Sequence, residues 1–583
     1  MLVFNHKNAI SSTEFKGFEG ICATAPHKHV PSADDIVNFR VLGDGSLLKR
    51  CGFSHIANCD GKIRTVWSGN LEGEQVTLIV YGIYVVKVNI ADKTLVPLGR
   101  LGIPGGNIKF IYFKSQLYIM DEWSFYKVTK EGVEYLSAYA PLYGKLWGVA
   151  QKGKVYEPLN LATRHIRMSY RVDQELIYLC VDHLISSIDA VYIDGQKVTD
   201  SGRYYFNRSL MCVCVMGLEL GQIVDLYLTV DESELDILRL RSCKQSAILG
   251  GYTDTKLFFW DGLYDGCIYS SREVDAVALI SSSYVYGEAL PLYFPADSII
   301  STEGEKRKIT ALCRHYDRLL LFTDENTWMI DDTLESTNIL SGAIMINSSH
   351  GCTSAGAAIT CGNDPICVGD GAILKWTAET DDLNECNVYS ISSQIEPFLK
   401  PSFFKNAKIL LNKKHSELLF YEPSDEDGLV WIYNYKTENW YKFDGIGANE
   451  FFLCEDMLGF IKGTSIYLFD ETLNHDIDSE GNEREIIATF ESHPIDLDVY
   501  ANKKRLAGMS MSASFKGGSI CAEYLSDSNS QRIASVTIKD ESTYPTNYIK
   551  RLNSQRFSYL TLRLTAKGDA SSRIYSTNIF TKL

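Results

Sequence analysis

The stretch "VNFRVLGDGSLLKRCGF", residues 37–53, places two short apolar runs on either side of a Gly-Asp-Gly turn at 43–45. Glycine reaches positive φ at little cost and aspartate bonds to its own turn, so the pattern predicts strand, tight turn and strand. The basic residues Lys49 and Arg50 follow, and then Gly-Phe. The stretch is neither a phosphate-binding loop nor a nucleophile elbow. We therefore interpret it as a structural element of the fold.

The length and charge of the chain limit the classes of protein to which it can belong. A chain of 583 residues is too long for one compact core, so several domains are expected. Apolar residues make up 45% and charged residues 22%, which is ordinary for a globular protein and excludes wholesale disorder. The formal charge of −16 argues against a dedicated nucleic-acid binder. An acidic wall would instead let DNA slide past without sticking.

The cysteines and the apolar runs indicate the cellular compartment in which the chain folds. The chain has 15 cysteines, an odd number without framework spacing, and several lie in apolar strands. Reduced thiols that act as small core residues fit this pattern, so we expect folding in a cytoplasm. The first residues hold no apolar run long enough for a signal peptide, and no stretch approaches a membrane span. We expect no membrane anchor.

Aromatic residues and repeats indicate the fold class. The chain has 34 Tyr, 26 Phe and 8 Trp, which fit pleated, half-buried surfaces, and 43 Gly that supply turns. Units of strand, turn, strand, turn and strand recur at 75–90, 107–129, 308–331, 406–443 and 449–470. Aromatic pairs such as Tyr84 with Tyr126 repeat at roughly 40 to 50 residues, which is typical of β-propeller blades.

We therefore predict an all-β protein: a β-propeller of six or seven degenerate blades, with an inserted small β-sandwich and a C-terminal β-domain. Stacked sandwiches are the alternative, because no WD or kelch signature is present. A strong hairpin signal, Asp194-Gly195, lies in the inserted region. The expected domains are an N-terminal arm and strand that closes the propeller (1–60), the first blades (61–153), the inserted sandwich (154–235), the remaining blades (236–470) and the C-terminal β-domain (471–583).

One stretch resembles a metal site. "HDIDSEGNE", 475–483, has Asp476, Asp478 and Glu480 alternating before a glycine, as in a calcium loop. The loop needs a bidentate carboxylate at its twelfth position, where Ile487 stands. We favour a solvated linker here.

Three weaker motifs also favour structural readings. The cysteines of "CGNDPIC" (361–367) are too far apart for a zinc knuckle, and an exposed segment explains "HKH" (27–29) better than a metal site. "NRS" at Asn207 is a glycosylation acceptor only in a secreted protein. We predict no bound metal and no cofactor.

Acidic residues provide the only enzyme candidates. A propeller glycosidase would use carboxylates facing the channel, and turn chemistry explains the available ones equally well: Asp254, Asp261, Asp265 and Glu273. No glycine-rich phosphate loop and no histidine-based triad is present. We predict that the protein is not an enzyme and has no catalytic or cofactor-binding residues.

The opening stretch, extended to "ADDIVNFRVLGDGSLLKRCGF", resembles the N-terminal segment of bacteriophage tail propeller proteins of the tail-nozzle type, also called tail-hub or stabilisation proteins. In that family an extended strand with the pattern N…dG-x-l-x-x-R-x-G precedes the first blade. The matching positions are Asn38, Asp44, Gly45, Arg50 and Gly52. Further matches follow in the family's order at 256–276, 290–331, 349–376 and 503–576.

The resemblance implies a structural virion protein of a phage tail. Such proteins form rings, so we expect a homohexameric nozzle or hub that extends the DNA-ejection conduit. The implied partners are other copies of the chain, an adjacent portal or adaptor ring, and tail-fibre or tail-tip proteins. DNA would pass without sequence-specific binding. The implied location is the virion tail, after assembly in the cytoplasm of the bacterial host.

Two other functions remain open. A receptor-binding adhesin at the tail tip would expose aromatic clusters, such as Trp260 with Tyr264 or Trp431 with Trp440, although blade packing also explains these residues. A carbohydrate-active propeller enzyme would hold two carboxylates roughly 5 to 10 Å apart across a pocket.

Overall fold

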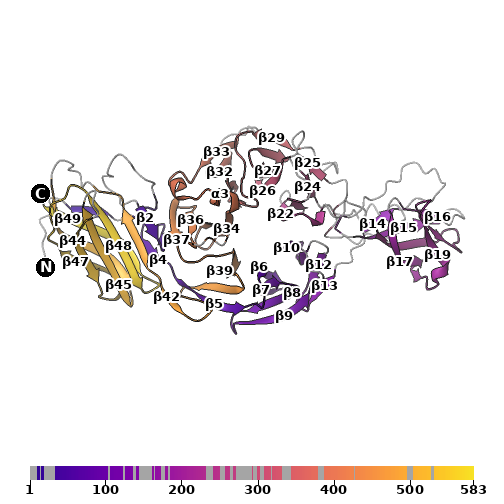
Figure 1. The fold of residues 1–583 in the computed structure, drawn as a ribbon, viewed down its shortest axis with the longest axis horizontal. Coiled ribbons are helices and arrows are strands. Elements are labelled where there is room, and N and C mark those ends of the chain that lie inside the picture. Colours follow the sequence, from indigo (N-terminus) through magenta and orange to yellow (C-terminus); the bar gives the residue numbers. More distant parts are fainter. Residues whose placement is uncertain are drawn as a thin grey trace.

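The computed structural model of the chain is nearly all β, as the sequence predicts, with only short helical turns among the residues it describes (Figure 1). The helical turns are Ser201–Arg203, Glu396–Phe398 and α3 (Phe403–Asn406). The described residues are 9–12, 15–18, 33–102, 106–121, 125–135, 140–143, 161–162, 164–172, 178–181, 184–231, 240–249, 256–262, 267–270, 292, 294, 299–301, 307–316, 318–330, 343–378, 386–423, 425, 427–495, 503–526 and 531–582.

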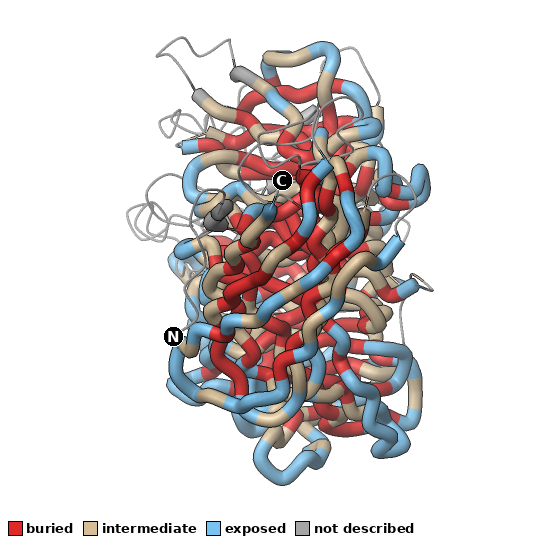
Figure 2. The backbone as a smooth tube through the Cα atoms, turned by 90° about the vertical axis from the view of Figure 1, so that its left-hand side faces the viewer, coloured by how far each residue is buried: buried red, intermediate tan, exposed pale blue. Residues whose placement is uncertain are grey.

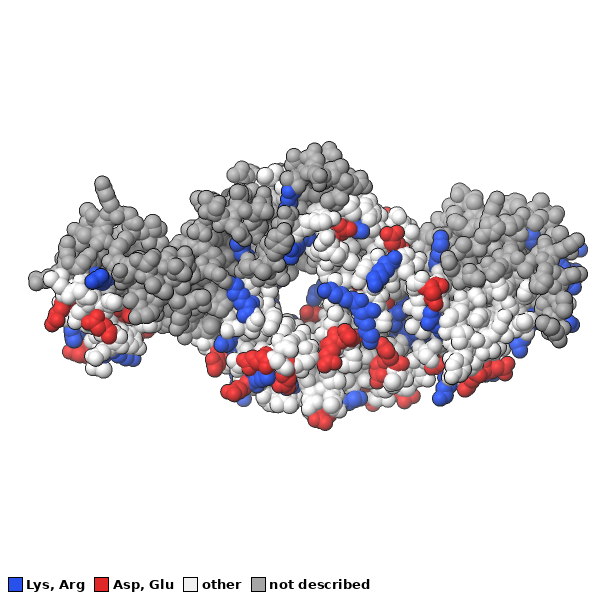
Figure 3. Space-filling model, turned by 180° about the vertical axis from the view of Figure 1, so that it is seen from behind, with Lys and Arg blue, Asp and Glu red and all other residues white. Residues whose placement is uncertain are grey.

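Four-stranded antiparallel units follow one another around a central opening, which is also visible in the space-filling view (Figures 1 and 3). Five of these units each use consecutive strands. Their strands are β6 (Ile63–Leu71), β7 (Glu74–Tyr81), β8 (Tyr84–Asn89) and β9 (Thr94–Arg100); β10 (Lys109–Phe113), β11 (Gln116–Met120), β12 (Phe125–Val128) and β13 (Val133–Tyr135); β22 (Gln245–Leu249), β23 (Lys256–Trp260), β24 (Cys267–Ser270) and β25 (Ile299–Ser301); β26 (Ile309–His315), β27 (Arg318–Thr323), β28 (Thr327–Ile330) and β29 (Ile344–Asn347); and β30 (Ala358–Cys361), β31 (Asp364–Val368), β32 (Ile373–Ala378) and β33 (Cys386–Ser390).

Two further units complete this set of seven in the described part of the chain. One is the first half of a nine-stranded sheet: β34 (Lys408–Asn412), β35 (Glu417–Tyr421), β36 (Val430–Asn434) and β37 (Asn439–Phe443). The other combines strands from distant parts of the chain: β38 (Glu450–Cys454), β39 (Met457–Lys462), β40 (Ser465–Asp470) and β5 (Gly52–Asn58).

Strand β5 fills the open edge of β40. The two strands run antiparallel, and Leu468 lies opposite Ser54. Phe53 from β5 packs edge-on against the rings of Phe460, Tyr467 and Phe469, with centroids 4.9 to 5.6 Å apart. Without β5 the backbone groups of β40 would form an unpaired edge.

A β-sandwich lies beside the ring and contains strands from both ends of the chain (Figure 1). One sheet consists of β3 (Phe39–Val41), β4 (Leu47–Lys49), β49 (Arg573–Lys582), β44 (Arg505–Phe515) and β47 (Ser542–Arg551), with β1 (Ala9–Ser12) added along β49. The other consists of β2 (Ala33–Val37), β43 (Ala488–Ser492), β48 (Leu560–Gly568), β45 (Gly518–Ser526) and β46 (Gln531–Ile538). A ribbon of β41 (His475–Ile477) and β42 (Glu483–Glu485) connects ring and sandwich.

The sandwich core follows the alternation of its strands. Leu560, Leu562, Leu564 and Ala566 of β48 are fully buried, and the residues between them are half-buried. This period of two is what a strand shows when one face packs on a second sheet. Buried residues accordingly run through the middle of the sandwich and exposed ones along its margins (Figure 2).

The inserted region forms its own two sheets at the end of the molecule opposite the sandwich (Figure 1). The Asp194-Gly195 pair makes the expected hairpin turn, with positive φ at both residues. The first sheet contains β14 (Ala140–Tyr143), β15 (His165–Arg171), β21 (Ile223–Val230), β17 (Ile185–Ile193) and β18 (Gln196–Lys197), and the second contains β16 (Tyr178–Cys180), β20 (Cys212–Val215) and β19 (Tyr204–Asn207). None of the helices in the described residues is long and apolar enough to span a bilayer.

Replacing Phe53 by alanine removes the ring that joins β5 to the aromatic cluster of β39 and β40. Because Phe53 is buried, we expect the Phe53→Ala change to lower the free energy of unfolding by about 3–5 kcal/mol. Urea titration followed by tyrosine and tryptophan fluorescence measures the loss. The control is Tyr544→Ala on β47, where the side chain is 78% exposed and the change should stay within about 0.5 kcal/mol. Equal shifts for both variants would contradict the packing role of Phe53.

Candidate functional site at the ring–sandwich junction

The centre of the junction between ring and sandwich is the buried side chain of Arg50, which follows β4. Its terminal nitrogens donate to both carboxylate oxygens of Asp476 on β41, at 2.9 and 2.8 Å. Its Nε donates to Oδ1 of Asn38 at 2.8 Å. Arg50 is 1% exposed and Asp476 is 4% exposed. The guanidinium thus donates to the Asp476 carboxylate and to the Asn38 amide oxygen. A charged group can stay buried in a protein when it has such partners.

Asn38 connects the same network to the end of β37. Its Nδ2 donates to Oδ1 of Asp444 at 2.7 Å and to the carbonyl of Ile487 at 3.0 Å, and the backbone N–H of Asp444 donates back to Oδ1 of Asn38. Asn38 has a φ of 58°, a left-handed conformation that asparagine tolerates better than most residues. The kink between β2 and β3 therefore depends on Asn38 in two ways. Its backbone adopts the left-handed conformation, and its side chain makes the hydrogen bonds.

The turn at 43–45 is fixed by Asp44. The backbone N–H and hydroxyl of Ser46 donate to Oδ1 of Asp44 at 3.1 and 2.6 Å, and Arg573 of β49 pairs with its other oxygen. Burial alone would raise the pKa of Asp44, but the Ser46 hydrogen bonds and Arg573 outweigh it and lower the pKa. Gly45 supplies a φ of 74°.

Gly52 stands where β5 leaves the junction beside β41. A Cβ atom at this position would lie 1.9 Å from the carbonyl oxygen of His475, so no larger residue fits without moving the backbone. Together with Asn38, Asp44, Gly45 and Arg50, it completes the set of positions that carry the family resemblance. Asn38, Arg50 and Gly52 lie at the junction, whereas the side chain of Asp44 bonds to Ser46 and Arg573 within the sandwich.

A second buried ion pair lies next to this network. Nε of Arg40, on β3 of the sandwich, donates to Oε1 of Glu417, on β35 of the ring, at 2.6 Å. The hydroxyl of Tyr441 donates to the same oxygen at 2.8 Å, and Asn412 donates to Oε2 at 3.3 Å. Burial would lower the pKa of Arg40, but the Glu417 carboxylate more than offsets it, so the pKa is raised.

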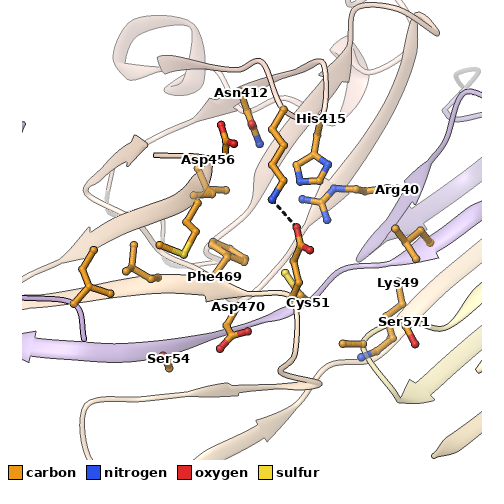
Figure 4. Close-up of a pocket in the computed structure, with 18 of the residues that line it drawn as sticks. Arg40, Lys49, Cys51, Ser54, Asn412, His415, Asp456, Phe469, Asp470 and Ser571 are labelled. Atoms are coloured by element: carbon orange, nitrogen blue, oxygen red, sulfur yellow. Dashed lines mark hydrogen bonds and ion pairs between the residues drawn. The ribbon is translucent and has the colours of Figure 1, made fainter. Parts of the chain in front are cut away.

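A pocket of about 720 Å³ opens between ring and sandwich beside this pair (Figure 4). Arg40 and His415 point toward one another inside it (Figure 4), and Lys414 and Glu471, which also line it, form an ion pair of 2.8 Å. Burial, and then the charge of Arg40, lower the pKa of His415, so the imidazole is neutral at pH 7. Burial raises the pKa of the Cys51 thiol, which also lines the pocket.

The stretch 475–483, which resembles a calcium-binding loop in sequence, takes part in the junction between ring and sandwich. Asp476 holds Arg50, and Oδ1 of Asp478 accepts the backbone N–H groups of Glu480 and Asn482, both at 2.8 Å, within its own turn. Across the described residues, no cluster of three or more His, Cys, Asp or Glu side chains has the spacing to hold a metal ion.

Of the four enzyme candidates, Asp261 alone lies in the described residues. Asp261 has a φ of 61° and pairs with Lys308 at 2.9 Å, while Asp254, Asp265 and Glu273 lie outside the described part of the chain. The "HKH" segment also lies outside it. Asn207 uses its Oδ1 to accept two backbone N–H groups of the following turn. Cys361 and Cys367 are free thiols on the paired strands β30 and β31.

The aromatic residues proposed for receptor contact are buried. Trp260, Trp431 and Trp440 are 3%, 5% and 0% exposed, and Trp440 donates its indole N–H to the carbonyl of Ile391 at 2.7 Å. Tyr264 lies outside the described residues. These tryptophans pack the interior of their units instead of forming an exposed cluster.

Sequence reasoning missed the Arg40–Glu417 pair and the pocket beside it. One signal was available, because Glu417 is a charged residue at the start of the apolar strand "ELLFY". A charge in a strand that is buried throughout needs a partner. Nothing in the sequence points to Arg40 as that partner, since the two residues are 377 positions apart.

Comparisons with known proteins yield distant structural likenesses. No protein-family model matches the chain, and no curated protein matches it. Among solved structures, Kluyveromyces lactis Hsv2 has a TM-score of 0.27 and 8% identity, over 66% of this chain and 98% of that one. An exo-β-1,3-galactanase from Phanerochaete chrysosporium has a TM-score of 0.23 and 7% identity, over 82% and 96%. At these TM-scores neither likeness carries an inference about function.

The Arg50–Asp476 pair should show strong coupling in a double-mutant cycle. We expect Arg50→Met or Asp476→Leu alone to lower the free energy of unfolding by about 3–5 kcal/mol, because each leaves one buried charge unpaired. The double variant should recover much of this loss. Urea unfolding measures all four proteins. The exposed pair Arg532–Glu523 is the matched control, with coupling of at most about 1 kcal/mol. Additive losses at Arg50 and Asp476 would contradict the network.

Lys49 should make stability depend on pH in the alkaline range. Burial, and then the charge of Arg50, lower the pKa of this lysine to about 8, below its ordinary value of about 10.4. Between these values the unfolded chain binds a proton that the folded chain has lost, so stability rises with pH. We therefore expect the urea midpoint of the wild type to rise relative to that of Lys49→Met between pH 8 and about pH 10. The exposed Lys516→Met change should reproduce the wild-type profile, and parallel profiles for Lys49→Met would exclude a lowered pKa.

Proposed function

We propose that this chain is a structural subunit of a bacteriophage tail, where copies of it form a ring, the nozzle or hub, around the path of ejected DNA. In this proposal the seven four-stranded units are the blades of one β-propeller, and β5 closes its last blade. The function lies in contacts with other proteins and involves no catalysis. Expected partners are further copies, a portal or adaptor ring, and tail-fibre or tail-tip proteins.

The observation that carries the proposal is that Asn38, Arg50 and Gly52 meet at the junction of ring and sandwich, while Asp44 and Gly45 shape the turn between β3 and β4. These five positions carry the resemblance to tail-nozzle proteins. The pattern therefore encodes a specific architecture: a ring of sheets rigidly attached to a sandwich. This supports extending the resemblance from a short motif to the whole molecule.

The shape of the molecule is also suited to ring assembly. The sandwich and the inserted region lie at opposite ends of the ring of sheets, so the two ends present different surfaces (Figure 1). A closed ring of identical subunits needs contacts between two unlike faces of each subunit. A rigid junction keeps these faces at a fixed angle, which a closed ring requires of every copy.

The charge of the chain fits a conduit that does not retain DNA. The formal charge of −16 would repel phosphates along a channel formed between copies. The charge is uneven, because in Figure 3 Lys and Arg side chains gather beside the opening of the single subunit and acidic ones lie mainly along its lower margin. We assign the DNA path to the assembled ring and not to this opening.

The test is the assembly state of the purified full-length protein. Light scattering after gel filtration gives its mass in multiples of the 65.5 kDa chain, and electron microscopy shows the shape of any assembly. We expect closed rings with a channel wide enough for duplex DNA, formed by the protein alone or on its portal or adaptor ring. A chain that stays monomeric alone and beside co-expressed portal and adaptor proteins would contradict the proposal.

A further inference from the structure

The junction pocket contains a buried guanidinium, that of Arg40, which bonds to the described residues through one of its three nitrogens. Arg40 is 6% exposed, and its Nε donates to Glu417. The aromatic ring of Phe443 covers one face of the guanidinium, with the central carbon 5.1 Å from the ring centroid. Nη1 and Nη2 make no hydrogen bond to any described residue, and the guanidinium extends into the pocket (Figure 4).

The fork of Arg40 is held in place before any ligand arrives. Glu417 accepts from Tyr441 and Asn412 as well as from Arg40, so three hydrogen bonds hold its carboxylate in its present orientation. A guanidinium presents its terminal N–H groups in a planar fork that matches a carboxylate or phosphate. Two terminal nitrogens without partners inside a pocket are therefore a preformed oxyanion site.

The volume of the pocket and the side chains that line it determine which kind of oxyanion can bind. Its volume of about 720 Å³ lies in the range of small-molecule sites, and much of its lining is apolar, including Leu48, Ile56, Met457, Leu458 and Phe469. Lysines and acids are nearly balanced along the lining, with Lys49, Lys93 and Lys414 against Asp456, Asp470 and Glu471. With Arg40 included, the lining holds one more basic than acidic side chain, so the single charge of a carboxylate balances it, whereas a phosphate monoester with nearly two charges at pH 7 leaves an excess.

We infer that the junction pocket binds a small organic monocarboxylate, whose oxygens accept from Nη1 and Nη2 of Arg40 and whose aliphatic or aromatic body lies on the apolar wall. All of the residues belong to one chain, so the site does not depend on assembly of the proposed ring. Glu471 competes with the ligand, because its carboxylate lines the same pocket, where it pairs with Lys414.

Titration calorimetry with the full-length protein tests the site directly, with benzoate and hexanoate as probes. We expect one saturable site per chain for at least one of them. The neutral isosteres benzamide and hexanamide should bind at least about tenfold more weakly, because they lack the charge that strengthens the hydrogen bonds. Inorganic phosphate should also bind more weakly. Amides that bind as well as the acids, or no binding of either acid, would overturn the proposal.

Two substitutions with opposite expected effects locate the site. Arg40→Lys keeps the charge but loses the fork, so affinity should fall at least about tenfold. Glu471→Gln removes the competing charge at an exposed position, so affinity should rise severalfold even if the Arg40 variant does not fold. The distant change Glu541→Gln, at an exposed position, is the control and should leave affinity unchanged. An unchanged or weaker affinity in Glu471→Gln would overturn the assignment.

Alkylation of Cys51 gives a second, independent readout of position. Saturating benzoate should slow the labelling of Cys51, which lines the pocket, and leave Cys521 on β45 unaffected, as read by peptide mass spectrometry. A leucyl-aspartyl-leucine peptide with blocked ends should fail to displace benzoate. Displacement by this peptide would overturn the assignment to a free acid and give the site to a side-chain carboxylate of a partner protein.

Discussion

The buried charge of Arg50 is the constraint on which the rest of the architecture depends. A guanidinium that is 1% exposed must find hydrogen-bond acceptors for its N–H groups, and here they come from β41, from the kink after β2 and from the end of β37. Because an unpaired buried charge is far more costly than a paired one, these segments are held in one arrangement. The angle between ring and sandwich is therefore fixed by hydrogen-bond geometry as well as by apolar packing.

The path of the chain strengthens this connection. The N-terminal strands β2, β3 and β4 build the sandwich, and the next strand, β5, completes the sheet of β40 in the ring. Strand β2 also lies between β37 and β43, so one nine-stranded sheet crosses from ring to sandwich. Neither body can form fully until strands separated by hundreds of residues have met. Contacts of such high sequence separation slow folding, because loop closure must precede them.

The sequence predicts local features well and long-range partners poorly. The all-β class is confirmed, since aromatic composition and glycine spacing act through strand and turn preferences. The roles of Asn38 and Asp476 could not be predicted, because each depends on a residue that is distant in the chain. From Asp476 in β41 to Glu480 the alternation of acids resembles a calcium loop, whereas Asp476 faces the buried arginine and Asp478 caps the turn that follows. A polar or charged residue in a buried segment needs hydrogen-bond partners, but the folded structure alone shows which residues these partners are.

The junction pocket follows from the same constraint. Arg40 belongs to the sandwich and Glu417 to the ring, so their ion pair fixes one wall of the space between the two bodies. Two charged residues side by side in the sequence have different partners: Lys49 donates to the backbone carbonyl of Gly568 at the end of β48, and Arg50 holds Asp476 of the ribbon. Side chains committed to these bonds cannot collapse into the remaining space. The pocket thus lies where buried ion pairs join the two β-structures, beside the apolar core that ring and sandwich share.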